Sequence, residues 1–444
     1  MQMTLPQDVH HILQTLNELQ YNTYVVGGCV RDVLRGQKPQ DWDIATAAPP
    51  EAVIAAFPKT VPTGIAHGTV TVVLPGGKYE VTTLRVDGVY ENHRSPQSIT
   101  FTGEITEDLS RRDFTMNAMA YHPETGLIDP FGGQADIAAG IIRCVGDPMV
   151  RFDEDALRML RAVRFSAQTG FPLKEDILLA MQKLAPLLSA ISYERIRDEL
   201  IKTLCTDLPE RIVLLQETGI LEVILPELAR CFSVAQNIKY HIYDVGWHSI
   251  HVMRHTPKNP VLRLAGLLHD IGKPDKKTTD EAGVDHFKGH DAVSAELADA
   301  VLTRLRIDNH TKNQVIKLIT FHDRRMEASK KAVRRTANKI GPDLFLDLLA
   351  LQRADTRGQN PALLQERMAH FDTLESLWRE ILEDEDALSL SDLAIDGRDL
   401  MALGYQGKEI GNRLAAALDY VLEHPEANKR DTLLDFIQNI HCKN

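Results

Sequence analysis

The stretch YVVGGCVRDVLRGQKPQDWDIAT, residues 24–46, decides the fold of the first part of this chain. Its beginning, YVVGGCV, predicts a short apolar strand that ends at Gly27 and Gly28, followed by a helix from Val30 to Arg35. Glycine lets the backbone approach a phosphate closely, and helix N-terminal amides together with Arg31 can donate hydrogen bonds to it. A glycine pair alone is more often a plain turn, so the feature needs support from its surroundings.

Two aspartates follow in DWDIAT, residues 41–46, which predicts a second strand. Alternate strand residues point to one face, so Asp41 and Asp43 can hold the same divalent ions, and Mg²⁺ suits such oxygen ligands. Acids beside a phosphate-binding turn suggest nucleotidyl transfer with two metal ions, one activating a 3′ hydroxyl and one holding the triphosphate. Glu80, in the later strand YEVTTLRV (residues 79–86), is either a third acid of this site or an ordinary edge-strand residue.

The pattern changes after about residue 140, where the strand signals end. From RFDEDALRMLRAVRF, residues 151–165, onward, apolar residues recur at three- and four-residue spacing, which predicts helices almost to the C-terminus. The expected fold class is therefore α+β, with a mixed-sheet head followed by an all-α remainder.

The composition excludes several classes of protein. The 444 residues, 43% of them hydrophobic, suffice for several domains. We expect a cytoplasmic protein with reduced thiols, because no apolar run can span a bilayer, the N-terminus does not resemble a signal peptide, and the five cysteines lack metal-site spacing. The net charge of −12 argues against a uniformly basic surface. A local basic patch is compatible with this charge. One candidate, on a predicted helix, is either a nucleic-acid contact or a solvated helix face: Lys330, Lys331, Arg334, Arg335 and Lys339.

Four separated motifs resemble those of the class II tRNA nucleotidyltransferases, the CCA-adding enzymes, within the DNA polymerase beta superfamily. In order they are Gly27-Gly28 with Arg31-Asp32, then Asp41 with Asp43, then RRDFTMNA at residues 111–118, then Glu154-Asp155 with Arg158. YERI, residues 193–196, resembles the family's last motif, and the resemblance covers about residues 20 to 230. It implies a polymerase-beta-like nucleotidyltransferase head and a helical neck.

The resemblance also implies roles for individual residues. Asp41 and Asp43 would be the catalytic Mg²⁺ ligands, and Glu80 joins the catalytic set from its own strand position. The nucleotide would be bound by a larger set, in which Glu154, Asp155 and Arg158 form a base-reading template: Gly27, Gly28, Arg31, Arg112, Asp113, Asn117, Glu154, Asp155, Arg158, Arg161 and Arg164.

Physical chemistry supports the template, because residues three apart on a helix share a face. Cytosine and adenine offer an amino donor beside an unprotonated ring nitrogen, so Asp155 could accept from the first and Arg158 donate to the second. Uracil and guanine reverse this polarity and should be rejected. The competing interpretation of Asp155 and Arg158 is a surface salt bridge.

The segment RVDGVYENHRSP, residues 85–96, resembles the flexible loop with which the family switches from C to A. Relatives that add only CC tend to lack this loop, so its presence favours full CCA addition or A addition alone. Ser95 stands where an arginine is frequent in the family. The alternative is a disordered surface loop.

A second constellation lies in the helical part, around LAGLLHDIGK (residues 264–273) and FKGHDAVSA (residues 287–295). Imidazoles and carboxylates suit divalent metals such as Mn²⁺, Fe²⁺ or Ni²⁺. The order of six residues resembles the dinuclear form of the HD phosphohydrolases: His248, His269, Asp270, His290, His322 and Asp355. The substrate could be a 2′,3′-cyclic phosphate, a phosphate on damaged tRNA or a nucleotide by-product, and a purely structural metal is the alternative. Lys273 and Lys288 either hold a substrate phosphate or are solvated.

The sequence therefore predicts four segments: a head (1–140), a helical neck (141–230), an HD body (231–365) and a helical tail for tRNA contact (366–444), with a helix beginning near Lys408. The predicted function is addition of CCA, from CTP and ATP, to tRNA. The alternatives are A addition alone, poly(A) polymerase, and an HD phosphohydrolase with a degenerate RNA-binding head. No membrane partner is expected, and the sequence does not indicate an oligomeric state.

Overall fold

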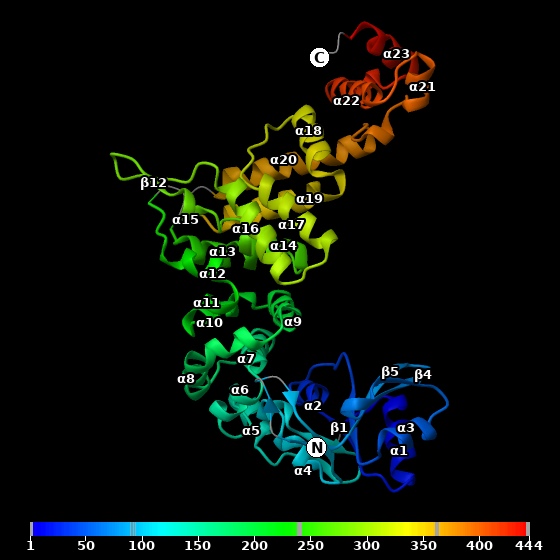
Figure 1. Cartoon of the computed structure of the whole chain (residues 1–444), viewed down its shortest axis with the longest axis vertical. Coiled ribbons are helices and arrows are strands. Elements are labelled where there is room, and N and C mark those ends of the chain that lie inside the picture. Colours follow the sequence, from blue (N-terminus) through cyan, green and yellow to red (C-terminus); the bar gives the residue numbers. More distant parts are fainter. Residues whose placement is uncertain are drawn as a thin grey trace. The chain divides into compact units, whose positions relative to one another are not determined.

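The computed structural model describes residues 3–88, 90–91, 93, 95–237, 242–359 and 364–440. The chain forms two compact units, Met1–Pro226 and Glu227–Asn444 (Figure 1). The mixed-sheet head and the first helices after it belong to the first unit, and the second unit is almost entirely helical. The expected fold class is confirmed, while the finer division into four segments stays a prediction.

A seven-stranded mixed sheet forms the head, in the order β11-β10-β1-β2-β5-β4-β3. β2 and β5 run parallel, and the other neighbouring pairs of this sheet are antiparallel. The strands are β1 (Thr23–Val26), β2 (Asp43–Thr46), β3 (Thr60–Gly64), β4 (Thr69–Leu74), β5 (Gly77–Thr83), β10 (Ala120–His122) and β11 (Gly126–Ile128).

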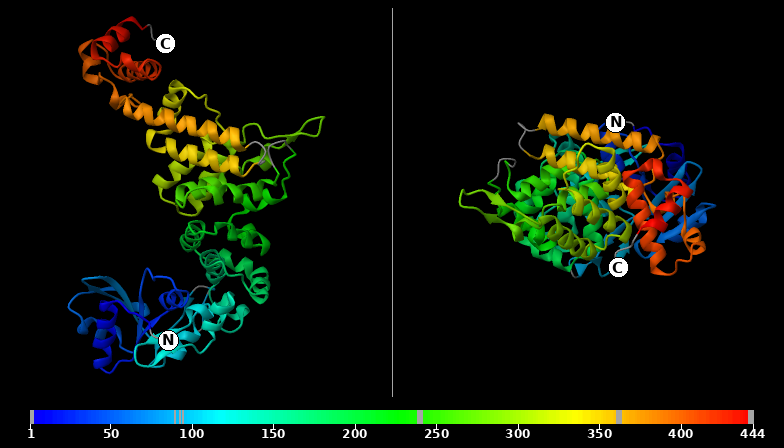
Figure 2. Two further views of the ribbon diagram at one scale, coloured as in Figure 1. Left: turned by 180° about the vertical axis from the view of Figure 1, so that it is seen from behind. Right: turned by 90° about the horizontal axis from the view of Figure 1, so that it is seen from above.

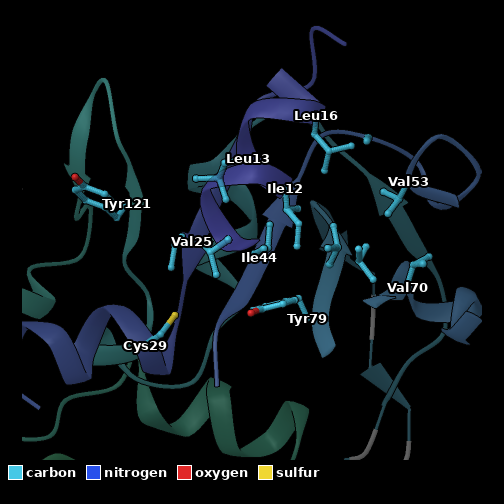
Figure 3. Close-up of a cluster of buried hydrophobic side chains, with 14 of the residues drawn as sticks. Ile12, Leu13, Leu16, Val25, Cys29, Ile44, Val53, Val70, Tyr79 and Tyr121 are labelled. Atoms are coloured by element: carbon cyan, nitrogen blue, oxygen red, sulfur yellow. The ribbon is translucent and has the colours of Figure 1, made fainter. Parts of the chain in front are cut away.

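One face of this sheet carries the hydrophobic core. α1 (Gln7–Glu18) and α3 (Pro50–Ala56) contribute Ile12, Leu13 and Val53, which pack with Val25 and Ile44 of the central strands (Figure 3). Each of these side chains is buried, and full burial of such a side chain contributes about 1.5–3 kcal/mol. The opposite face carries a smaller hydrophobic cluster with Val26 and Ala45, and beside it the polar residues of β2 and β5.

Asp43 and Glu80 lie on that opposite face. Ile44 of β2 is paired with Val81 of β5, and both are buried. Since successive strand residues alternate between faces, the preceding residues Asp43 and Glu80 are neighbours on the exposed side. Strand pairing alone therefore brings together two of the three predicted acids.

The glycine pair joins β1 to α2 (Gly28–Leu34), which confirms the expected order of strand, turn and helix. Gly27 has a φ of +76°, in the left-handed region that favours glycine. A β-carbon at Gly27 would lie 3.0 Å from Nη1 of Arg112 and 3.7 Å from Oδ2 of Asp43. The turn thus needs glycine both for its backbone conformation and for the close approach of Arg112.

Helices complete the first unit, but the template segment differs from its prediction. Asp155 interrupts the helix with φ −139° and ψ 102°, so Asp155 and Arg158 are not on one continuous helix. The reason is local, because its carboxylate accepts from the amide of Leu157 (3.2 Å), one of the unpaired amides at a helix start. The helices are α4 (Ile105–Ser110), α5 (Gly133–Ala139), α6 (Pro148–Glu154), α7 (Leu157–Thr169), α8 (Glu175–Leu184), α9 (Tyr193–Leu204), α10 (Val213–Glu217) and α11 (Ile220–Ile224).

The second unit is a helical body followed by a helical tail. Within the body, α13 packs against α14 and α19, and a hairpin of β12 (Thr278–Thr279) and β13 (Asp285–His286) projects from the helices (Figure 2). In the tail, α22 begins at Lys408, as expected. The helices are α13 (Val245–His255), α14 (Pro260–Leu268), α15 (Lys273–Lys276), α16 (His290–Arg304), α17 (Asn309–Phe321), α18 (Lys330–Ile340), α19 (Phe345–Arg357), α20 (Leu364–Glu383), α21 (Gly397–Ala402), α22 (Lys408–Glu423) and α23 (Arg430–Asn439). Among the described residues, no helix is long and apolar enough to cross a bilayer.

Candidate functional site

A cleft of about 1330 Å³ in the first unit brings the head motifs together. Small-molecule sites usually measure about 300–1,000 Å³, so the cleft has room for a nucleoside triphosphate and part of a second substrate. Of the predicted head residues, Glu154 is the one outside its lining. The others line it: Gly27, Gly28, Arg31, Asp41, Asp43, Glu80, Arg112, Asp113, Asn117, Asp155, Arg158, Arg161 and Arg164.

The cleft is basic although the chain as a whole is acidic. Its lining has seven acidic residues and ten basic ones, which are Lys38 and the nine arginines Arg31, Arg35, Arg85, Arg111, Arg112, Arg158, Arg161, Arg164 and Arg195. Such a concentration of guanidinium groups in a concave site favours a polyanionic ligand such as a triphosphate.

The acids form a crowded negative group within this basic surrounding. Burial raises the pKa of Asp43 above its usual value, Arg112 opposes the shift, and the negative charges of Glu80 and Asp41 add to it. A divalent cation relieves this repulsion, and carboxylate oxygens are the ligands that Mg²⁺ prefers. The residues present therefore fit a Mg²⁺ site.

A buried carboxylate holds the RRDFTMNA arginines in place. Asp108, at 1% exposure, accepts from Nη2 of Arg111 at 2.6 Å and from Nη2 of Arg112 at 3.1 Å. Although burial opposes it, the charges of Arg112 and Arg111 keep the pKa of Asp108 below its usual value. Sequence reasoning missed Asp108, but an acid three and four residues before two arginines is a detectable signal.

The arginines of α7 are fixed by acids from other elements. Arg161 donates to Asp113 (2.7 Å), and Arg164 donates to the buried Glu199 of α9 (2.6 Å). The guanidinium of Arg164 also lies 4.2 Å from the ring centre of Phe165, a cation–π distance. These contacts hold the arginines at the cleft wall before any ligand arrives.

The predicted template residues each have a protein partner. Arg158 donates to Glu154 (2.6 Å), at the end of α6, whereas Asp155 accepts from Arg195 of α9 (2.8 Å). Arg195 belongs to the YERI motif, so this motif touches the template directly. Reading a base would require Arg158 to exchange an acceptor, whereas Oδ2 of Asp155 can accept a further hydrogen bond while it stays paired with Arg195.

Four of the five residues of the candidate basic patch on α18 are paired with acids from the tail of the same unit, and the fifth, Lys339, is exposed. Lys330 contacts Glu380 and Asp384, and Lys331 lies 3.1 Å from Glu423. The remaining pairs are Arg334 with Asp386 and Arg335 with Glu423. A free nucleic-acid contact on this helix is therefore disfavoured.

The six residues of the second constellation meet around Asp270. Its carboxylate lies 3.1 Å from Nε2 of His269, 3.2 Å from Nε2 of His290 and 3.7 Å from Nε2 of His322. His248 Nε2 is 3.5 Å from Asp270 and 3.0 Å from Asp355. All four imidazoles are buried.

Each imidazole is oriented by its other nitrogen. The Nδ1 atoms of His248, His269, His290 and His322 lie 2.6–3.2 Å from the backbone carbonyls of Gly358, Gly266, Phe287 and Ile319. A carbonyl that binds Nδ1–H leaves Nε2 as the metal-binding atom, which is the usual arrangement of histidine ligands. Two groups of three ligands share Asp270, so the residues fit two cations.

Lys273 is not the solvated lysine that the sequence favours at this position. It is buried, and its Nζ lies 2.7 Å from Asp270 and 2.8 Å from Oε1 of Gln236. The solvated interpretation is therefore wrong for Lys273, whereas Lys288 is exposed.

Three family models match separate parts of the chain. Residues 23–143 match "Poly A polymerase head domain", residues 170–232 match "Probable RNA and SrmB- binding site of polymerase A", and residues 290–437 match "tRNA nucleotidyltransferase domain 2". The glycine turn and paired acids of the mixed sheet lie inside the first match, so fold and site define the nucleotidyltransferase class.

Solved structures extend the similarity to the whole chain. The Bacillus stearothermophilus CCA-adding enzyme, solved in complex with CTP, is 30% identical, with 98% of each chain covered and a TM-score of 0.77. The Thermotoga maritima CCA-adding enzyme, complexed with tRNA, shares the fold at 20% identity and a TM-score of 0.58, over 99% of this chain and 97% of that one. The chain therefore belongs to the family of CCA-adding enzymes and poly(A) polymerases.

Curated relatives match more strongly over a shorter range. The CCA-adding enzyme of Geobacillus thermodenitrificans is 52% identical over 219 residues, which are 49% of this chain and 54% of that protein. That of Geobacillus stearothermophilus is 51% identical over 224 residues, or 50% and 55%. The matched part of the chain thus spans about half the length of these relatives.

Proposed function

We propose that this protein adds C, C and A, taken from CTP and ATP, to the 3′ end of tRNA without a nucleic-acid template. The observation that carries the proposal is the pairing of Asp43 with Glu80 beside Gly27 and Arg112 in one basic cleft. The relatives support it, because the Geobacillus proteins are CCA-adding enzymes and the Bacillus structure contains CTP. The cytoplasm is the proposed location.

The residues of the cleft divide the task between them. The backbone at Gly27 and Gly28 and the guanidinium groups of Arg31 and Arg112 hold the triphosphate. Asp41 and Asp43 hold Mg²⁺, which when bound supplies the positive charge that activates the 3′ hydroxyl and steadies the triphosphate. The tRNA 3′ hydroxyl gives its proton to water, its oxygen forms a bond to the α-phosphorus, and the bond between the α-phosphorus and the bridging oxygen breaks to release pyrophosphate.

Base choice is proposed for Asp155 and Arg158. An amino group of cytosine or adenine would donate to Asp155, and the adjacent ring nitrogen would accept from Arg158. To do this, Arg158 exchanges one of its protein acceptors, such as Glu154, for the ring nitrogen of the base. The assignment predicts that Arg158→Ala relaxes discrimination against UTP and GTP.

To test the proposal, purified protein is incubated with Mg²⁺, with CTP, ATP or both, and with a tRNA that ends either at the discriminator base or at CC. Three additions to the first tRNA support CCA addition. One A on the CC-ending tRNA alone indicates an A-adding enzyme, and long A tails indicate a poly(A) polymerase. Asp43→Asn should abolish all additions, and full activity in this variant would overturn the assigned role of the carboxylates.

A second function is favoured by the orientation of the four histidines in the second unit. We propose that His248, His269, His290 and His322, with Asp270 and Asp355, hold divalent transition metal ions such as Mn²⁺, Fe²⁺ or Ni²⁺ for phosphate-ester hydrolysis. When bound, such ions activate water and polarise a phosphoryl group. The test is an assay for hydrolysis of 2′,3′-cyclic phosphate on tRNA ends and of nucleotide monoesters, and His269→Ala should lose this activity. If the protein binds metal but hydrolyses neither substrate, the metal has a structural role.

A further inference from the structure

Two described residues of the segment 85–96, Tyr90 and His93, contact the template. The carbonyl oxygen of His93 accepts from the amide of Ala156 (3.0 Å), and the hydroxyl of Tyr90 lies 3.3 Å from Nη2 of Arg158. Ala156 is the residue between Asp155 and the first turn of α7. The segment thus contacts the exact part of the chain where the helix is interrupted and the template residues are placed.

Tyr90 completes the hydrogen bonding of Arg158. Nη1 of Arg158 donates to Glu154 (2.6 Å) and to the carbonyl of Arg151 (3.2 Å). Nη2 donates to the carbonyl of Arg111 (3.0 Å) and to Tyr90. Each terminal guanidinium nitrogen carries two hydrogens, so all four have acceptors, and the side chain is buried. In this state Arg158 has no terminal N–H to offer to a base.

The Tyr90 hydroxyl is itself fixed in orientation. It donates to Oδ2 of Asp87 (2.7 Å), so its oxygen is left to accept from Arg158. Asp87 is in turn held by Arg85, whose Nε lies 3.1 Å from Oδ1. Burial raises the pKa of Tyr90 to about 12, so its hydroxyl is protonated at neutral pH by a wider margin than that of an ordinary tyrosine.

We propose that Tyr90 is a positioning residue that holds Arg158 in a resting conformation, from which the arginine must be released before it reads a base. The inference rests on the proposed function, in which Arg158 contacts the incoming nucleotide. Only molecules in which Arg158 is released from the resting conformation can bind a nucleotide. The apparent affinity for every nucleotide is therefore the intrinsic affinity multiplied by the fraction of molecules in the released conformation. The Tyr90 hydroxyl therefore weakens binding of CTP and of ATP alike.

The test is Tyr90→Phe, which removes the hydroxyl and keeps the ring. The KM for CTP and the KM for ATP should both fall, by about three- to tenfold, because a hydrogen bond to a charged group that favours the resting state is lost. The kcat should change little. Tyr79→Phe is the matched control, since Tyr79 also donates to an aspartate (Asp8, 3.3 Å) but does not line the cleft.

A double variant separates this role from general stabilisation of the head. In an Arg158→Ala background, Tyr90→Phe should leave both KM values unchanged, because the hydroxyl acts through Arg158. Unchanged or raised KM values in the single variant, or an equal effect without Arg158, would overturn the inference. If the unmodified protein incorporates no nucleotide, the proposed function itself fails, and that result is distinct.

Discussion

Oδ2 of Asp108 accepts from Nη2 of Arg112 at 3.1 Å, and this contact holds the arginine against the glycine turn. Nη1 of the same guanidinium lies 3.0 Å from the position of a β-carbon at Gly27. The arginine that we propose to bind phosphate is therefore placed by a carboxylate that does not line the cleft. Arg111 shares that carboxylate, so one buried group positions two cations of the cleft.

Asp108→Asn should weaken triphosphate binding. The amide keeps the shape of the side chain but removes the negative charge opposite two arginines, so Arg112 loses its fixed orientation. We expect the KM for both nucleotides to rise about tenfold, the equivalent of one lost charge-assisted hydrogen bond. Steady-state kinetics measure the KM for CTP with a tRNA that ends at the discriminator base and the KM for ATP with a CC-ending tRNA. Asp136→Asn, which alters a buried carboxylate paired with Arg143 outside the cleft, should leave the KM unchanged.

The same carboxylate makes stability depend on pH. Because the folded-state pKa of Asp108 is below its usual value of 3.8, its contribution is fully present above that value. It is lost as the pH falls through the folded-state pKa. The difference in unfolding free energy between the unmodified protein and Asp108→Asn should thus be largest near pH 6 and shrink below about pH 4. Urea denaturation at both pH values measures this difference, and a constant difference would contradict the assignment.

Gly27→Ala should damage binding more than folding. A non-glycine residue at the φ of +76° and ψ of −132° of Gly27 costs about 1–3 kcal/mol, and the new methyl group would also push Arg112 away from the turn. Gly36→Ala is the matched control, because Gly36 has a φ of +71° with nothing within 4 Å of the added β-carbon. Both variants should lose similar stability in denaturant titrations. Only Gly27→Ala should raise the KM for nucleotides, and equal KM values would show that Arg112 is not displaced.

Sequence reasoning succeeded where a local pattern carries the information. The order of strand, glycine turn and helix at residues 24–34 depends on neighbours in the chain, as does the burial of Ile44 beside Asp43. The resemblance to the HD phosphohydrolases also named six distant residues of the second unit, and the structure places them close together.

Contacts between distant side chains were not predictable in the same way. The chain alone did not indicate that Glu199 would hold Arg164, or that Glu423 would neutralise Lys331, since helix packing decides both. The interruption at Asp155 was also missed, because its neighbours have ordinary helical spacing. It depends on a single carboxylate that binds the amide of Leu157 in place of helical backbone geometry.

His269→Ala should remove transition metal from the protein without stopping nucleotide addition. His269 donates one of the buried Nε2 atoms around Asp270, and its loss leaves a group of three possible ligands incomplete. We expect metal analysis after incubation with Mn²⁺ or Ni²⁺ and desalting to show fewer bound ions per chain. Nucleotide addition to tRNA should stay close to that of the unmodified protein. His310→Ala, at an exposed position on α17, should retain the full metal content. Equal metal content in the two variants would mean that the buried imidazoles serve packing alone, and loss of nucleotide addition in His269→Ala would mean that the two units depend on each other.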